Sequence, residues 1–125
     1  MRHIQTLQVK TDANASLSGT QTEVGGTELV IDTTVAASQT DSLIACAFDK
    51  DTLRSVIIVA DKDCTLETNS GSAPGNTIAL KANVPLIWNA SSGYFANPFA
   101  AADVTAFYLT TGTSSTRFQA RILNT

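Results

Sequence analysis

Residues 53–88 read LRSVIIVADKDCTLETNSGSAPGNTIALKANVPLIW, a succession of short apolar runs separated by turn residues. The first run, Leu53–Ala60, is apolar at nearly every position, which predicts a central strand buried on both faces. The later runs, at Cys64–Thr68, Ile78–Leu80 and Val84–Trp88, alternate between apolar and polar residues and predict further strands. Clusters of Asn, Ser, Gly and Pro between them predict tight turns. We expect the rest of the chain to pack on these strands.

The flanking sequence adds more strands and no helical periodicity. Leu29–Val35 alternates, Leu43–Phe48 is a short apolar run, and Val104–Thr110 and Phe118–Ile122 alternate again. This amounts to about eight or nine short strands, a number typical of two-layered all-β folds. We therefore expect an all-β fold, a two-sheet antiparallel sandwich that is jelly-roll-like and has about eight strands. An eight-stranded closed barrel stays open as the alternative, because sequence predicts strand number but not closure.

The N-terminal segment follows a different pattern. Ile4–Val9 alternates weakly, and residues 11–27, TDANASLSGTQTEVGGT, show no apolar periodicity. This predicts either an edge strand with a long loop or an arm that finds its partners on another subunit. We expect residues 1–28 to form this edge strand or arm and residues 29–125 to form the sandwich, within a single domain overall.

Composition narrows the function classes. The chain has 125 residues, of which 43% are hydrophobic and 15% charged, so it can form one core and is too apolar for disorder. Its net charge of −3 offers no basic field for nucleic acid. No apolar stretch approaches the roughly 20 residues that span a bilayer, and the first residues lack the apolar block of a signal peptide. We expect no nucleic-acid partner, no membrane partner and synthesis in a cytoplasm.

No residue pattern predicts catalysis, a metal site or a cofactor. His3 is the only histidine, and we expect it to be solvated near a mobile N-terminus. Asp61 and Asp63 predict a turn, because the other ligands of a calcium loop are missing. Cys46 and Cys64 are expected to be buried free thiols, with a disulfide between neighbouring strands as the alternative. We therefore expect no enzyme.

Aromatic residues gather near the end of the predicted central strands. Trp88 shares a predicted face with Val84 and Leu86, which favours a place in the core. Three more aromatic residues follow in a loop. They are expected either to contact another subunit or to cover the core, and the sequence does not decide between these two roles. Apolar residues of the N-terminal strand are the other exposed candidates. The candidates for a partner interface are Tyr94, Phe95, Phe99, Ile4 and Leu7.

A series of short motifs resembles a family of small virion proteins of tailed bacteriophages and related prophages. The residues that carry it are Ser55–Ile58 with Ala60–Asp61, Thr65–Ser70, Pro74, Thr77–Ile78 with Leu80–Ala82, Pro85–Leu86 with Trp88, Tyr94–Phe95 with Asn97–Pro98, and Asp103–Thr105. The resemblance covers more than a third of the chain closely and, more loosely, nearly all of it after Leu29. Residues 1–28 match less clearly.

The resemblance implies a jelly-roll-like capsid decoration or cement protein, made in the host bacterial cytoplasm and located on the outer capsid surface of the virion. Its implied partner is the major capsid protein of the phage shell, and shell symmetry suggests a homodimer or homotrimer. The alternative is a carbohydrate- or receptor-binding sandwich of a head or tail fibre, in which Trp88, Tyr94 and Phe95 would stack on sugar rings.

Overall fold

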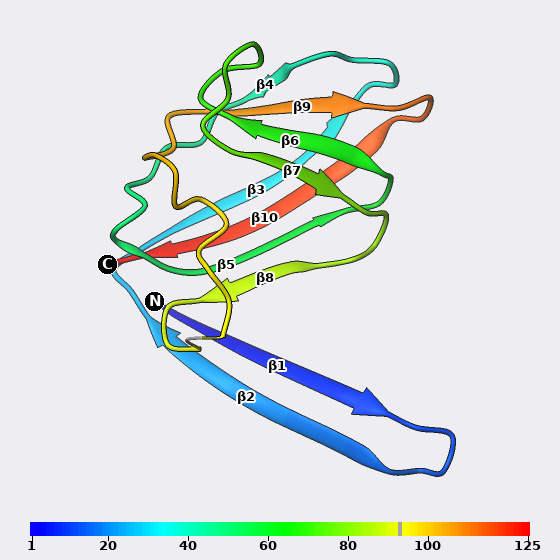
Figure 1. Cartoon of the computed structure of the whole chain (residues 1–125), viewed down its shortest axis with the longest axis vertical. Helices are drawn as coiled ribbons and strands as arrows, with labels where there is room; N and C mark the ends of the chain where they lie inside the picture. The colour runs from blue at the N-terminus through cyan, green and yellow to red at the C-terminus, as the bar shows by residue number, and fades with distance from the viewer. Residues whose placement is uncertain (93) are drawn as a thin grey trace.

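The protein is built of strands joined by turns, and the computed structural model describes residues 1–92 and 94–125 (Figure 1). The predicted all-β class is confirmed. The part of the chain that is described holds no helix long and apolar enough to cross a membrane. Its strands are β1 (Arg2–Lys10), β2 (Ser16–Val24), β3 (Thr27–Val35), β4 (Ser42–Ile44), β5 (Leu53–Ala60), β6 (Cys64–Thr68), β7 (Thr77–Leu80), β8 (Leu86–Asn89), β9 (Phe107–Thr111) and β10 (Thr116–Asn124).

Eight of these strands form two antiparallel sheets, in the orders β3-β10-β5-β8 and β4-β9-β6-β7. The chain passes from one sheet to the other at every connection of the sandwich except β6 to β7, which are neighbours in one sheet. This order is that of a jelly roll, so the predicted two-sheet sandwich is confirmed. The ladders described do not join the two sheets into one, which separates the fold from the closed barrel.

The core lies between the two sheets and follows from the strand periodicity. In β10, Phe118, Ala120 and Ile122 are buried, whereas the residues between them face solvent. In β5, Val56 and Ile58 are buried and Ile57 is only half-buried, because one face of this sheet is open. The prediction of a central strand holds for the position of β5 between β10 and β8, although its outer face is partly exposed.

Aromatic rings fill the middle of the core. Phe99 stacks on Phe107 with ring centroids 5.8 Å apart and an interplanar angle of 24°. Phe48 and Phe118 meet Phe107 edge-on, a geometry that the ring quadrupoles favour. The aromatic loop after β8 therefore sends one ring into the core.

Two sequence predictions need correction. Residues 16–24 form strand β2, which the sequence did not predict. The segment shows no apolar periodicity because most of its side chains are exposed on both faces of the strand. The predicted strand over Leu43–Phe48 is only Ser42–Ile44, after which Phe48 makes an isolated bridge to Val104. By contrast, Cys46 and Cys64 are buried free thiols, as expected.

Strands β1 and β2 form a separate two-stranded hairpin, here called the arm (residues 2–24), which extends away from the sandwich (Figure 1). Pairing runs without a break from Arg2 opposite Val24 to Lys10 opposite Ser16. The strand partner of β1 is thus β2 of the same chain, so residues 11–27 hold a second strand where a long loop was one of the two expectations.

Candidate interaction surface

The arm is fixed to the sandwich at its base by Gln5. Its side-chain amide donates to the Ser55 hydroxyl at 2.9 Å and to the backbone carbonyl of Trp88 at 3.0 Å. Its carbonyl oxygen accepts a hydrogen bond of 2.9 Å from the Asn89 side chain. One side chain thereby connects β1 to both β5 and β8, and it fixes the position of the arm by polar contacts.

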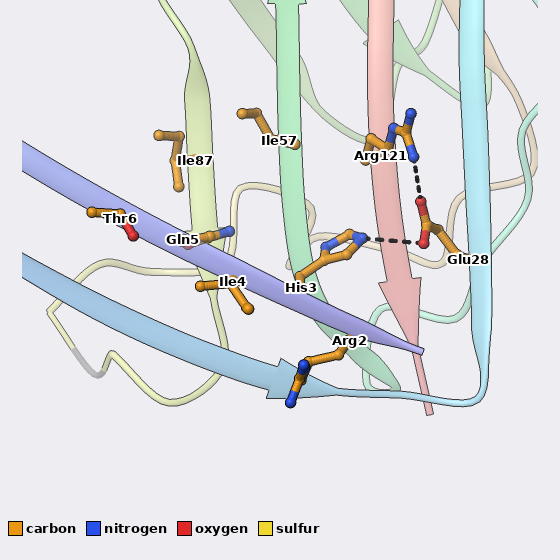
Figure 2. Close-up of a pocket in the computed structure, with 9 residues that line it drawn as sticks. All are labelled: Arg2, His3, Ile4, Gln5, Thr6, Glu28, Ile57, Ile87 and Arg121. Carbon is orange, nitrogen blue, oxygen red and sulfur yellow. Dashed lines mark hydrogen bonds and ion pairs between the residues drawn. The ribbon is translucent and has the colours of Figure 1, made fainter.

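His3 strengthens the same junction. Its Nδ1 shares a hydrogen bond of 2.9 Å with the Ser55 hydroxyl, and its Nε2 lies 3.7 Å from the Glu28 carboxylate. Figure 2 shows Glu28 between His3 and Arg121, whose guanidinium donates to it at 3.1 Å. With 12% of its side chain exposed, His3 is a docking residue, which corrects the expectation of a solvated histidine.

A buried carboxylate holds the other strand of the arm. Glu23 of β2 accepts a hydrogen bond of 2.9 Å from the backbone amide of Ser91, and its second oxygen lies 3.4 Å from the Arg54 guanidinium. Buried carboxylates are rare unless they are paired in this way. The pair joins the arm, β5 and the loop after β8.

The connection from the arm to β3 requires a glycine. The amide of Gly25 donates to the Met1 carbonyl at 2.9 Å, and the N-terminal ammonium donates to the Gly25 carbonyl at 2.8 Å. A Cβ at this position would collide with the backbone carbonyl of Asn124. The glycine therefore permits close contact between the base of the arm and the end of β10.

A hollow of about 380 Å³ lies in the corner between β1 and the outer face of the β3-β10-β5-β8 sheet (Figure 2). We call it the corner hollow. Ile4, Ile57 and Ile87 give it apolar walls, and Arg121 and Glu28 form its polar side. This mixture of an apolar centre and a charged edge is typical of surfaces that bind a separate protein.

A larger hollow, of about 530 Å³, lies between the arm and the segment that follows β8. We call it the groove. Trp88 packs against the core and donates its indole N–H to the Phe95 carbonyl at 3.0 Å, which positions the loop beside the arm. None of the described residues that line the groove is charged: they are Gln5, Thr6, Leu7, Gly19, Thr20, Gln21, Ile87, Trp88, Asn89, Ser91, Ser92, Tyr94 and Phe95.

The outer half of the arm carries a second apolar surface. Leu7, Val9 and Leu17 lie on one face of the hairpin, because Val9 pairs with Leu17 and residues alternate along each strand. Their exposed fractions are 69%, 59% and 79%. We call these three residues the tip face.

Other charged groups have structural roles. The pKa of Asp32 is lowered by its hydrogen bond and charge interaction with Arg117, whose Nη2 donates at 2.8 Å. The pKa of Asp63 is lowered by the hydrogen bond from the backbone amide of Ala82 and by Lys81. Asp61 accepts from the backbone amide of Arg117. The predicted turn role of Asp61 and Asp63 is therefore confirmed.

No three His, Cys, Asp or Glu side chains gather in a metal-binding arrangement within residues 1–92 and 94–125. Burial raises the pKa of Cys46 to about 12 and is the largest cause that raises the pKa of Cys64 to about 11. Both thiols are therefore protonated at neutral pH and are poor metal ligands and poor nucleophiles.

The structure places four of the five predicted interface candidates on the surface and one in the core. Tyr94 and Phe95 are 89% and 75% exposed, and Ile4 and Leu7 are also exposed on the arm. Phe99 has no exposed area and stacks in the core, so its place among the interface candidates is corrected.

Sequence reasoning missed Val9 and Leu17 as surface apolar residues. The available signal was Val9 in the alternating Ile4–Val9 segment and Leu17 among polar neighbours, but it becomes informative only once β2 is recognised as the partner of β1.

Comparison with known proteins adds no relative, since no family model, no curated protein and no solved structure matches this chain.

Proposed function

We propose that the chain is a non-enzymatic structural protein of a phage virion, a capsid decoration or cement protein that binds the assembled shell and stabilises it. One observation carries the proposal: exposed apolar side chains stand on an arm that leaves a well-packed sandwich. Such surfaces in a folded protein mark sites of contact with other macromolecules. The resemblance of the motifs between Ser55 and Thr105 to phage virion proteins supports the same assignment.

The corner hollow is the surface we assign to the shell, with the major capsid protein as its partner. Ile4 and Ile57 supply apolar area, and the Arg121–Glu28 pair supplies polar contacts at the edge. A protein that binds only the assembled shell stabilises it by mass action, since bound copies favour the assembled state over free capsid subunits. This role places the protein on the outer capsid surface and requires no reaction.

The test is to add the purified chain to phage shells that lack it and to image them by electron cryomicroscopy. We expect ordered, stoichiometric density on the shell and greater resistance of the shell to heat. Ile4→Glu should reduce the occupancy, whereas Leu43→Glu, at an exposed position on β4 in the other sheet, should bind like the wild type. Absence of density on the shell would refute the proposal.

A second candidate function is carbohydrate binding. Tyr94 and Phe95 stand exposed beside a groove that combines aromatic, amide and hydroxyl side chains without charge. Aromatic faces and neutral hydrogen-bonding groups are what sugar rings bind. Reproducible binding on a glycan array that is lost in Tyr94→Ala would favour this function over the capsid role.

A further inference from the structure

We infer that the tip face of one copy binds in the groove of a second copy, so that the protein associates with itself through its arm. Both surfaces belong to the same chain. The tip face is Leu7, Val9 and Leu17, and the groove, which Leu7 also borders, lies between the base of the arm and the Tyr94–Phe95 segment. The proposed occupant of the groove is therefore an apolar hairpin end of known sequence.

The reach of the arm is the first argument. The last hydrogen bond from a β1 side chain to the sandwich is made by Gln5. The strand continues for residues 6–10, which at about 3.4 Å per residue carries the arm roughly 17 Å further. Pairing with β2 is unbroken over this length. Figure 1 shows its outer end standing clear of the other strands.

The uncovered hairpin needs a second surface. Two-stranded hairpins are marginally stable in water unless one face packs against something else. The inner half of the arm packs against the sandwich through His3, Gln5 and Glu23. On the same face further out, the side chains change from polar to apolar at Leu7, which predicts that the outer half is covered by another molecule.

The lack of charged side chains on both surfaces favours a second copy as that molecule. Two copies with a net charge of −3 each repel one another, so they associate best where neither surface is charged. The described lining of the groove holds no charged residue, and the tip face is entirely aliphatic. Opposite Leu7, Gly19 leaves open space, since a Cβ there would meet nothing within 4 Å. An aliphatic side chain can therefore enter beside Leu7 without desolvating a charge.

The geometry also fits a closed assembly. Each copy carries one tip face and one groove, so the contact is satisfied reciprocally in a two-fold dimer or in sequence around a ring.

Sedimentation equilibrium of the purified full-length chain across a concentration range tests this. We expect the wild type to sediment as a multiple of 13.1 kDa. Leu17→Asp and Tyr94→Asp should each weaken self-association by roughly 100-fold or more, because each would bury an unpaired carboxylate. The control is Ser18→Asp, on the opposite face of the same strand, which should associate like the wild type.

Mixing the two weakened variants gives the sharper result. Leu17→Asp retains an intact groove and Tyr94→Asp an intact tip face, so an equimolar mixture should associate although neither variant does alone. A monomeric wild type, equal behaviour of Leu17→Asp and Ser18→Asp, or a mixture that stays monomeric would overturn the inference. Self-association requires no shell, so a monomeric chain that still decorates shells would refute this inference and leave the proposed function standing.

Discussion

Glu23 and Arg54 pair across the junction between the arm and the sandwich, with 3.4 Å between carboxylate oxygen and guanidinium nitrogen. Only 2% of the Glu23 side chain is exposed, whereas 39% of the Arg54 side chain is. Because the second carboxylate oxygen accepts from the Ser91 amide, Glu23 fixes the arm and one wall of the groove at the same time. The orientation of the arm and the shape of the groove are therefore coupled through one buried side chain.

Replacing Glu23 by alanine should lower the free energy of unfolding by about 1–3 kcal/mol, because the Ser91 amide loses its acceptor and Arg54 its partner. Urea unfolding followed by fluorescence measures the change. Asp12→Ala, which removes the same charge from the exposed turn of the arm, should change the free energy by less than about 0.5 kcal/mol. Equal effects of the two substitutions would show that Glu23 acts only through net charge.

Replacing Gln5 by alanine should loosen the attachment of the arm while the sandwich stays folded. The substitution removes the hydrogen bonds to Ser55, Trp88 and Asn89 that join β1 to the sheet. Hydrogen exchange should then accelerate in β1 and β2 and stay unchanged in β5 and β10, because local opening depends on local contacts. Gln8→Ala, on the exposed opposite face, is the control. Acceleration spread evenly over the whole chain would instead mean that the arm and sandwich open together.

The sandwich could be predicted from the sequence because its strands bury one face. The alternation of Phe118, Ala120 and Ile122 with polar residues indicates which side of β10 faces the core. The same alternation of burial is present in β6 and β9. The order in which the strands pair could not be predicted from the sequence. The position of β10 between β3 and β5 joins segments distant in sequence, and no local pattern specifies it.

The arm and its contacts could not be predicted, for two physical reasons. Strand β2 is exposed along most of its length and its buried side chain is Glu23, so it has no buried apolar face and no hydrophobic period. His3, Gln5 and Glu23 meet Ser55 and Arg54 only through the tertiary fold, because a polar docking site has no sequence period. In the aromatic loop, composition alone could not tell the buried Phe99 from the exposed Phe95.

That difference between two nearby phenylalanines gives a direct test of the core. Phe99→Ala should lower the free energy of unfolding by about 3–5 kcal/mol, because it leaves a cavity beside Phe107 and Phe48. Phe95→Ala should change it by less than about 0.5 kcal/mol, since its ring is 75% exposed. Thermal and urea unfolding measure both changes at protein concentrations low enough to keep the chain monomeric. Similar losses for the two variants would contradict the packing described for this loop.

Stability should fall with rising pH above about 9, and Cys46 should account for part of the fall. Burial raises the pKa of this thiol from 9.0 to about 12 in the folded chain, while the unfolded chain exposes it. Between these values the unfolded state loses the proton and the folded state keeps it, so deprotonation favours unfolding. The stabilisation that the buried, protonated Cys46 thiol contributes is complete below its pKa in the unfolded chain and is lost as the pH rises toward 12. Urea midpoints measured from pH 7.5 to 10.5 should therefore decline less steeply in Cys46→Ala than in the wild type. Parallel declines would show that the thiol does not titrate differently in the two states.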